Sequence, residues 1–221
     1  MRIPQLEVER GAKLAFIGES GSGKSTLLEL LAMILRPSKS GTFRFRPIAS
    51  DPGVDIDKVW RSNGSDRLSG WRSRYIGYVL QHGGLLPYLT VRGNIELPRR
   101  LLDLEVGRVA EELAERLGIA PQLDKLPAEL SVGQRQRAAI ARALAHEPPI
   151  VIADEPTAAI DPLNAERITL LLARLTDELG VTLIVASHAQ DLMRRTGFTL
   201  VSHDVDTADE HSMSVSVSSP G

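Results

Sequence analysis

Nine consecutive residues near the start of the chain have the types and spacing needed for phosphate chemistry. Gly18-Glu19-Ser20-Gly21-Ser22-Gly23-Lys24-Ser25-Thr26 matches G-x-x-x-x-G-K-[ST] at every fixed position. The three glycines would let the backbone curl until successive N–H groups point at phosphate oxygens. Lys24 would reach the β- and γ-phosphates, and the Ser25 hydroxyl would complete the ligand shell of a Mg²⁺ ion. This phosphate loop (residues 18–26) predicts a site for a nucleoside triphosphate.

The segments on either side of the loop have the patterns that such a site needs. Residues 13–17 form a short, largely apolar run, which is typical of a buried parallel strand. Residues 25–35 place four apolar side chains, Ile34 the last of them, on one helical face before Pro37. A loop between a strand and a helix also gains the positive end of the helix dipole. A chance Gly/Ser-rich turn would have neither flank.

Three further apolar runs lead into polar side chains that could act on the same ligand. They are residues 75–80 before Gln81, residues 150–153 before Asp154 and Glu155, and residues 181–186 before Ser187 and His188. Alternating strands and helices predict an α/β fold with a mainly parallel sheet covered on both faces. Ligands of such sheets bind at the carboxyl ends of the strands. We therefore expect these polar side chains and the phosphate loop to converge on one edge.

The polar residues after these strands suit different parts of phosphate chemistry. Asp154 suits a Mg²⁺ carboxylate, and Glu155 could orient or deprotonate a water aimed at the γ-phosphate. Gln81 has no diagnostic pattern of its own, but at the end of a strand it could be a ligand of Mg²⁺ or of a water molecule. His188 could sense the γ-phosphate. Without the phosphate loop, the acidic pair would read as a solvated strand end and His188 as an ordinary histidine.

A second polar cluster, Ser131-Val132-Gly133-Gln134, begins a helix predicted to extend to about His146. Ser131 and Gln134 have the spacing of a capping box, which gives the pattern a purely structural reason. The same helix N-terminus is also an anion site. Because the chain already has a phosphate loop, a second anion site suggests that two chains share nucleotides. Both interpretations remain open at this point.

Composition narrows the class of protein. The 221 residues include 43% hydrophobic and 24% charged residues, an ordinary globular balance. The net charge of −2 gives no basic excess, so no nucleic-acid partner is expected. The absence of cysteine excludes disulfides, zinc–thiolate sites and thiol catalysis. No apolar run approaches the length of a membrane span, so work at a membrane would require a partner.

The pattern along the chain suggests a core interrupted by a helical segment. Residues 1–84 are expected to form the first part of the core, with a small antiparallel β part at residues 2–8 and 42–46. Residues 47–73 are rich in Pro, Gly, Ser and Asp and predict a long surface connection. The remaining expected parts are a helical subdomain at residues 85–147, a second core part at 148–204 and a disordered tail at 205–221.

Six motifs in this order resemble the nucleotide-binding subunit of ATP-binding cassette (ABC) transporters. They are residues 18–26, Gln81, residues 130–134, residues 150–155, residues 159–161 and His188. The resemblance covers about residues 5–190 and implies a P-loop NTPase core, ATP with Mg²⁺, and a head-to-tail homodimer around two ATP molecules. Ser131, Gly133 and Gln134 would then face the γ-phosphate held by the other chain, and Asp161 would cross the interface.

The resemblance also implies a membrane partner and a location. Glu155 would direct hydrolysis, and an integral membrane permease would dock near Gln81 and residues 82–94. The subunit would lie in the cytoplasm, on the inner face of the cell membrane. Residues 81–98 look most like the lipoprotein-releasing, macrolide-exporting and cell-division (LolD/MacB/FtsE-like) branch. The cargo and the direction of transport do not follow from the sequence.

This sequence departs from the family's pattern at three places. Val132 stands where the family usually has a second glycine, and residues 47–66 look longer than the usual connection. The family usually stacks adenine on an aromatic residue well before the lysine, whereas no aromatic precedes Phe16 here. Contact with adenine would instead come from Arg2, Arg10 or an apolar side chain.

Other classes of P-loop protein fit less well. A soluble ABC-type ATPase acting on DNA or chromosomes shares the motif set, but such proteins carry coiled coils, zinc modules or basic surfaces that this sequence lacks. Translation-associated cassette proteins usually carry two cassettes in one chain. A small-molecule kinase with a phosphate loop would leave residues 131–134 and His188 unexplained.

Overall fold

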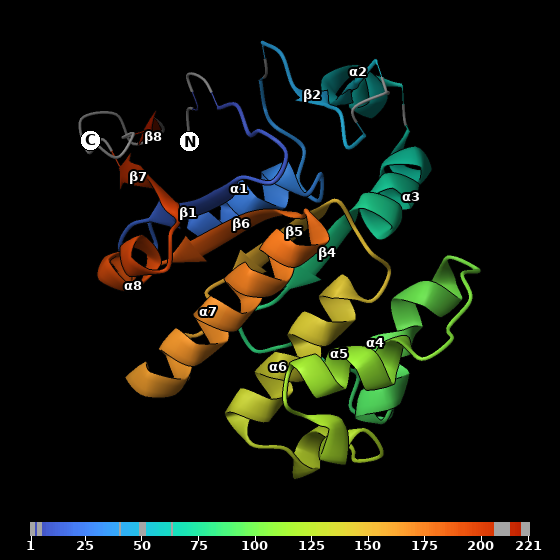
Figure 1. Cartoon of the computed structure of the whole chain (residues 1–221). Helices are drawn as coiled ribbons and strands as arrows, with labels where there is room; N and C mark the ends of the chain where they lie inside the picture. The colour runs from blue at the N-terminus through green and yellow to red at the C-terminus, as the bar shows by residue number, and fades with distance from the viewer. Residues whose placement is uncertain are drawn as a thin grey trace.

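The computed structural model describes residues 3, 6–39, 41–48, 52–62, 64–205 and 213–217, with side chains through Val201. The strands are β1 (Lys13–Ile17), β2 (Arg44–Phe45), β3 (Val54–Asp55), β4 (Ile76–Val79), β5 (Ile150–Asp154), β6 (Thr182–Ser187), β7 (Thr199–Val205) and β8 (Met213–Val217). The α-helices are α1 (Lys24–Leu31), α2 (Ile56–Arg61), α3 (Ser65–Tyr75), α4 (Val91–Leu101), α5 (Val109–Arg116), α6 (Val132–Leu144), α7 (Pro162–Leu179) and α8 (Gln190–Arg195). Figure 1 shows their arrangement.

The main sheet has the strand order β4-β5-β6-β1-β7-β8. Neighbouring strands run parallel from β4 to β7, and only β8 runs antiparallel to its neighbour. Strands β2 and β3 form a separate antiparallel pair. The predicted α/β fold with a mainly parallel sheet and a small antiparallel part is therefore confirmed.

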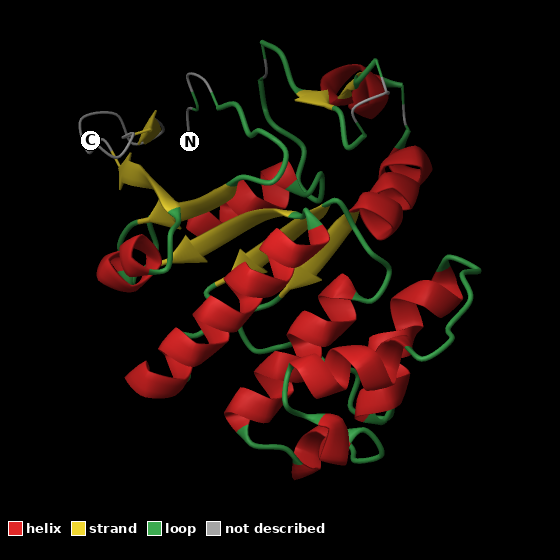
Figure 2. Ribbon diagram, in the orientation of Figure 1, coloured by secondary structure: helices red, strands yellow, loops and turns green. Residues whose placement is uncertain are grey.

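Helices cover both faces of this sheet (Figure 2). In β1, Leu14 and Phe16 belong to one hydrophobic cluster, which includes α1 residues, whereas Ala15 belongs to a second cluster with residues of α6 and α7. This alternation is what a strand buried on both sides requires. The sheet is therefore the middle layer, with a packed hydrophobic cluster on each face.

The helical segment, residues 85–147, shares its apolar contacts with the sheet. Val91 and Ile95 of α4 are fully buried in the same cluster as Val151 of β5 and Val185 of β6. The boundaries of the expected helical subdomain, residues 85 and 147, stay a prediction. Helix α6 packs on α4 within this segment and also on β4 of the sheet. Helix α6, which begins directly after Ser131, thus spans from the helical segment to the sheet.

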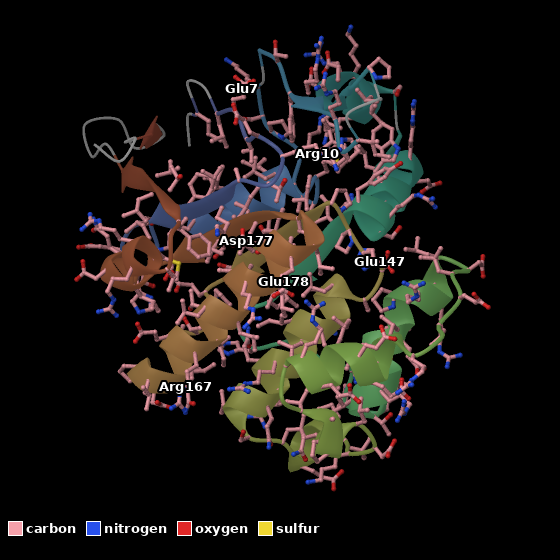
Figure 3. All side chains as sticks on the ribbon, viewed as in Figure 1. Glu7, Arg10, Glu147, Arg167, Asp177 and Glu178 are labelled. Carbon is pink, nitrogen blue, oxygen red and sulfur yellow. The ribbon has the colours of Figure 1, made fainter. Side chains whose placement is uncertain are left out.

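Helix α7 is tied to both parts by charged side chains near its C-terminus. Asp177 accepts a hydrogen bond at 2.5 Å from Lys13 of β1, and Glu178 pairs with Arg116 of α5. Figure 3 labels both acidic residues on α7. Surface pairs of this kind contribute little stability individually. No helix in the described ranges combines the length and apolar character needed to cross a bilayer.

The first helix is shorter than the sequence pattern predicts. Helix α1 ends at Leu31 rather than near residue 35, because Met33 adopts a left-handed conformation with φ of 59°. Met33 is fully buried by this turn, whereas Ile34 leaves the apolar face and is 47% exposed. The periodicity of the sequence continued past the residue at which the backbone turns.

The prediction of a plain surface connection at residues 47–73 is wrong. This stretch contains β3, α2 and most of α3, and Asp55 begins α2 by accepting hydrogen bonds from the amides of Asp57 and Lys58. The side chain of Phe45 lies 6.5 Å from Trp71 and 6.2 Å from Tyr75, measured between ring centroids. These rings pack the connection onto the fold. Helix α2 buries only Ile56 and Val59, and α3 buries only Leu68, so neither helix shows a clear apolar period.

The two ends of the chain also differ from the expectations. The described residues of the predicted 2–8 strand, Ile3 and residues 6–8, form no strand, and the others lie outside the described residues. Within the predicted tail, residues 213–217 form β8 and pair with β7. The alternation Met213-Ser214-Val215-Ser216-Val217 has the period of a strand, which the Ser-rich composition obscured. Residues 206–212 and 218–221 lie outside the described residues.

Candidate active site

The strand register brings the predicted site residues to one edge of the sheet. Ile17 of β1 pairs with Ser187 of β6, and Ala186 pairs with Asp154 of β5. The phosphate loop, Glu155 and His188 therefore start from three neighbouring strand ends, as the parallel fold requires. Strand β4 lies beyond β5, so Gln81 starts one strand further along the edge.

The phosphate loop turns tightly before α1. Gly21 and Gly23 have φ angles of 81° and 87°, a conformation that glycine adopts without strain. Lys24 is only 5% exposed, and its ammonium donates 2.7 Å hydrogen bonds to the carbonyls of Gly18 and Glu19. A buried ammonium needs such acceptors. The lysine is thereby held across the mouth of the loop.

The remaining loop residues divide into buried and exposed members. Glu19, Ser20, Gly21, Ser25 and Thr26 are exposed, whereas Ser22 is buried. The exposed members carry three hydroxyl groups, those of Ser20, Ser25 and Thr26, close to the N-terminus of α1, where the helix dipole favours an anion. This is the arrangement that a triphosphate needs.

Ser25 and Asp154 form a pair of oxygen ligands. The Ser25 hydroxyl donates to Asp154 Oδ1 at 3.1 Å. Mg²⁺ prefers oxygen ligands and is usually bound by one or two protein groups together with substrate phosphates. In the described part of the chain, no cluster of three or more acidic or histidine side chains could hold a metal alone. The donor set therefore fits a Mg²⁺ ion that arrives with a nucleotide.

Glu155 is held in an unusual backbone conformation. Its φ angle is 44°, which is uncommon outside glycine, and its amide donates to the Ala186 carbonyl at 3.0 Å. The carboxylate has Oε1 at 3.6 Å from Lys24 Nζ and Oε2 at 3.0 Å from His188 Nδ1. Local strain of this kind persists when the surrounding structure enforces it and is common at functional sites.

Tyr78 belongs to the surroundings of this site, although no sequence motif points to it. Burial raises the pKa of its phenol well above the usual value, and the negative charges of Asp154 and Glu29 add to the effect. Tyr78 pairs with Ile152 on the neighbouring strand. The phenol therefore stays neutral and is a hydrogen-bond donor at all physiological pH values.

The second group of predicted residues lies around a separate hollow of about 450 Å³. Its lining includes Ser131, Gly133, Gln134 and Asp161. The predicted capping box is present: Ser131 Oγ accepts from the Gln134 amide at 3.2 Å, and Gln134 Oε1 accepts from the Ser131 amide at 2.9 Å. The hydrogen bonds of this pair stay within the start of α6, so they leave the hollow open.

Asp161 begins helix α7, as its position before Pro162 predicts. Its side chain accepts from the Asn164 amide at 3.1 Å and from the Asn164 side chain at 2.8 Å. The hydrogen bond from the Asn164 side chain is the main cause that lowers the pKa of Asp161. Asp161 is therefore ionised at neutral pH and lies at the rim of the same hollow as Ser131.

Gln81 and Arg10, which is one of the residues predicted to contact adenine, lie outside the group formed by Lys24, Glu155 and His188. Gln81 is exposed and lines a smaller hollow of about 170 Å³ between α6 and the segment after Glu155. Gln81 takes no part in the contacts that join Lys24 to Glu155, Glu155 to His188 and Ser25 to Asp154. Arg10 is exposed and lies above the sheet (Figure 3), while Arg2 lies outside the described residues.

Comparison with known proteins agrees with this geometry. The profile of the ABC transporter family matches residues 2–158. The lipoprotein-releasing system ATP-binding protein LolD of Legionella pneumophila (strain Paris) is 37% identical over 204 residues, 90% of this chain and 84% of that protein. An uncharacterized ABC transporter ATP-binding protein of Thermotoga maritima (strain ATCC 43589 / DSM 3109 / JCM 10099 / NBRC 100826 / MSB8) is 40% identical over 196 residues, 87% and 79% of the two chains.

A solved structure has the same fold. The ATP-binding cassette MJ0796, described as a dimer in a post-hydrolysis state bound to ADP and Pi, superposes with a TM-score of 0.74 at 32% identity. The match covers 89% of this chain and 83% of that one. The family match, these relatives and the convergent strand ends lead to one conclusion: the chain belongs to the ABC transporter family, among its ATP-binding and ATP-hydrolysing subunits.

Proposed function

We propose that two copies of this chain close around two ATP molecules, hydrolyse them with Mg²⁺ and thereby drive an integral membrane partner. The observation that carries this proposal is the separation of two groups of residues. Lys24, Asp154 and Glu155 form one group, and Ser131 with Asp161 lines a different hollow. Each group suits part of a triphosphate site. A second copy, placed head to tail, would supply the missing part to each.

The second group suits the γ-phosphate of a nucleotide held by another copy. Ser131, Gly133 and Gln134 lie at the N-terminus of α6, whose dipole favours negative charge. A Cβ atom added at Gly133 would meet nothing within 4 Å, so the backbone there is open to close approach. Asp161, on the rim of the hollow, would contact the other copy. The dimeric cassette MJ0796 supports this arrangement by analogy.

The first group suits binding and hydrolysis. Lys24 and the loop amides would bind the phosphates, and Ser25 with Asp154 would hold Mg²⁺. When bound, this ion would neutralise charge developing on the phosphate oxygens. Glu155 would orient the attacking water and accept its proton, and His188 would position the Glu155 carboxylate. Gln81 would complete the water or Mg²⁺ shell when its segment moves toward the site.

The proposed partner is a membrane protein of the kind that works with ATPases of the LolD/MacB/FtsE-like branch. The LolD relative supports this branch because it matches 90% of the chain at 37% identity. The subunit would then work in the cytoplasm, at the inner face of the cell membrane, through that partner. Leu80 and Tyr88, which flank the Gln81 region, are 48% and 73% exposed and provide apolar surface there. No nucleic-acid partner is proposed.

Purification with the native membrane partner in mild detergent tests this function. The expected result is a co-purifying protein with few membrane spans and a large extracytoplasmic domain, together with ATP hydrolysis that the Lys24→Ala variant lacks. A partner with many spans and no such domain would contradict the branch and favour conventional import or export. Recovery of no membrane protein, with salt-sensitive DNA binding instead, would favour the chromosome-acting alternative.

A further inference from the structure

Arg142 joins helix α6 to the segment that follows Gln81. Its guanidinium donates hydrogen bonds to the Gly84 carbonyl at 2.7 Å and to the Gly83 carbonyl at 2.9 Å. The two glycines have φ angles of 75° and 60°, so both carbonyls are presented by a turn that other residues would strain. The planar guanidinium can satisfy two acceptors at once.

The same helix contacts this region at two further places. A Cβ atom added at Gly83 would lie 3.5 Å from the Arg135 carbonyl oxygen and 3.6 Å from Ala139 Cβ. A Cβ atom added at Gly77 of β4 would collide with the Ala143 carbonyl oxygen. Strand β4 therefore lies so close to α6 at Gly77 that no side chain fits there, and the turn at Gly83 lies within van der Waals reach of the same helix.

The far end of the segment is fixed by a different residue. Asn94 of α4 is fully buried, and its Oδ1 accepts from the Leu86 amide at 2.7 Å. Its Nδ2 donates to the carbonyls of Leu86, Leu89 and Thr90 at 3.0 to 3.1 Å. The segment of residues 81–90, called here the Gln81 segment, is thus held by α6 at its start and by α4 at its end.

We propose that Arg142 is a positioning residue that makes the Gln81 segment and the Ser131 end of α6 move as one body. Arg142 lies three turns along α6 from Ser131, or about 16 Å at 1.5 Å per residue. A rigid helix transmits a displacement of one end to the other. When Ser131 contacts a nucleotide, Arg142 holds Gln81 at a fixed position relative to Ser131. The effect on ATP hydrolysis rests on the proposed function. The hydrogen bonds from Arg142 to Gly83 and Gly84 do not depend on it.

The energetics favour a maintained contact. Burial lowers the pKa of the Arg142 guanidinium, but arginine keeps its charge at physiological pH. Hydrogen bonds to a charged donor are stronger than neutral ones, and partial burial protects them from competition by water. Removing the guanidinium would leave the Gly83 carbonyl, in a buried residue, without this donor.

The test compares Arg142→Met with Arg99→Met in the full-length chain. Methionine keeps much of the aliphatic stem but removes the donors. Arg99 is a matched control because it also donates to two backbone carbonyls, those of Glu105 and Ala145, outside the Gln81 segment. Arg142→Lys should restore part of the effect, since an ammonium can still reach a carbonyl.

Two readouts are measured in each variant: amide hydrogen exchange over residues 81–90, and kcat and KM for ATP. In Arg142→Met we expect faster exchange of the Gly83 and Leu86 amides and a kcat lowered about tenfold or more, with KM little changed, because the phosphate loop is intact. Arg99→Met should keep wild-type exchange in this segment. Thermal denaturation identifies any general loss of stability.

Unchanged exchange over residues 81–90 in Arg142→Met would overturn the proposal, as would a kcat no lower than in Arg99→Met. A parallel loss of kcat, ATP binding and melting temperature would also overturn it, because that pattern indicates a merely structural role. If the wild-type protein hydrolysed no ATP, the proposed function would fail. The exchange measurement would still decide whether Arg142 holds the segment.

Discussion

His188 Nδ1 lies 3.0 Å from Glu155 Oε2, while the other oxygen of the same carboxylate lies 3.6 Å from Lys24 Nζ. The Glu155 side chain is 13% exposed, so it is largely shielded between these two partners. A carboxylate fixed at both oxygens cannot rotate freely. This arrangement pre-orients the carboxylate that we propose as the base. A change at Glu155 should therefore affect hydrolysis rather than ATP binding.

Glu155→Gln should abolish ATP hydrolysis but preserve ATP binding. An amide of the same shape can still contact Lys24 and His188, but it cannot accept a proton, and general-base help contributes roughly 10²–10⁴ in rate. The variant should therefore accumulate as an ATP-bound dimer, measurable by size-exclusion chromatography with light scattering. The double variant with Lys24→Ala should stay monomeric. A monomeric Glu155→Gln protein with bound ATP would contradict the proposed shared site.

His146 should make the folded state less stable in acid. Burial is the main cause that lowers the pKa of His146 from 6.5 to about 4; a backbone contact with Ile76 opposes this shift and the charge of Arg99 adds to it. The unfolded chain therefore binds a proton between these values that the folded protein does not. The free energy of unfolding should be highest above pH 6.5 and should fall by ~3 kcal/mol as the pH drops toward 4.

Urea denaturation between pH 4.5 and 7.5 measures this effect. The comparison is with His146→Leu, which removes the titrating group, so that contributions from carboxylates cancel in the difference between the two proteins. The wild type should have the steeper dependence on pH over this range. Equal slopes would mean that His146 is protonated as easily in the folded state as in the unfolded chain.

The sheet was the most predictable part of this fold. The strands β4, β5 and β6 lie on the largely apolar runs predicted as strands before Gln81, Asp154 and Ser187. Burial on both faces of a parallel sheet leaves few other ways to place such runs. Helix α7 has clear end signals in the sequence, because Asp161 caps its start before Pro162 and Gly180 follows its last residue. The predicted end of α1 was wrong because Met33 turns the backbone while the apolar periodicity of the sequence continues. Helices α2 and α3 were not predicted because they bury too few residues to show a period.

The arrangement of the candidate site was predictable where it depends on motif residues at the ends of strands. The phosphate loop and Asp154 follow from types and spacing, because the fold brings strand ends together. The long-range contacts of Tyr78, Asn94 and Arg142 could not be found in this way. Their importance depends on which backbone carbonyls or carboxylates lie opposite them, and this is fixed by tertiary packing rather than by local pattern.

Val132→Gly should strengthen the ATP-dependent dimer. Val132 is 44% exposed and lines both hollows beside α6, so its branched side chain limits how closely another chain can approach. Glycine at this position would expose the backbone, and we expect the dimer Kd in the Glu155→Gln background to fall about tenfold, or ~1.4 kcal/mol. Analytical ultracentrifugation with ATP measures it. A weaker dimer would show that the valine contributes apolar contact instead.

Ser131 allows its capping role to be separated from its proposed contact with nucleotide. Ser, Asn and Asp are comparable N-cap residues, whereas Ser131→Ala should cost about 0.5–2 kcal/mol of stability because the Gln134 amide loses its acceptor. Ser131→Asp should therefore fold as well as the wild type, and its charge also favours the helix N-terminus. The same charge would repel a γ-phosphate presented by a second copy.

The measurement is ATP-dependent dimerisation of Ser131→Asp and Ser131→Asn in the Glu155→Gln background, with melting temperatures recorded in parallel. Both variants should melt like the parent, but only the aspartate variant should lose the dimer completely, since asparagine adds no charge. ATP binding to the monomer should be unchanged in both, because Lys24 and the phosphate loop are intact. A dimer that tolerates aspartate would mean that no phosphate approaches the start of α6, and Ser131 would then be only a helix cap.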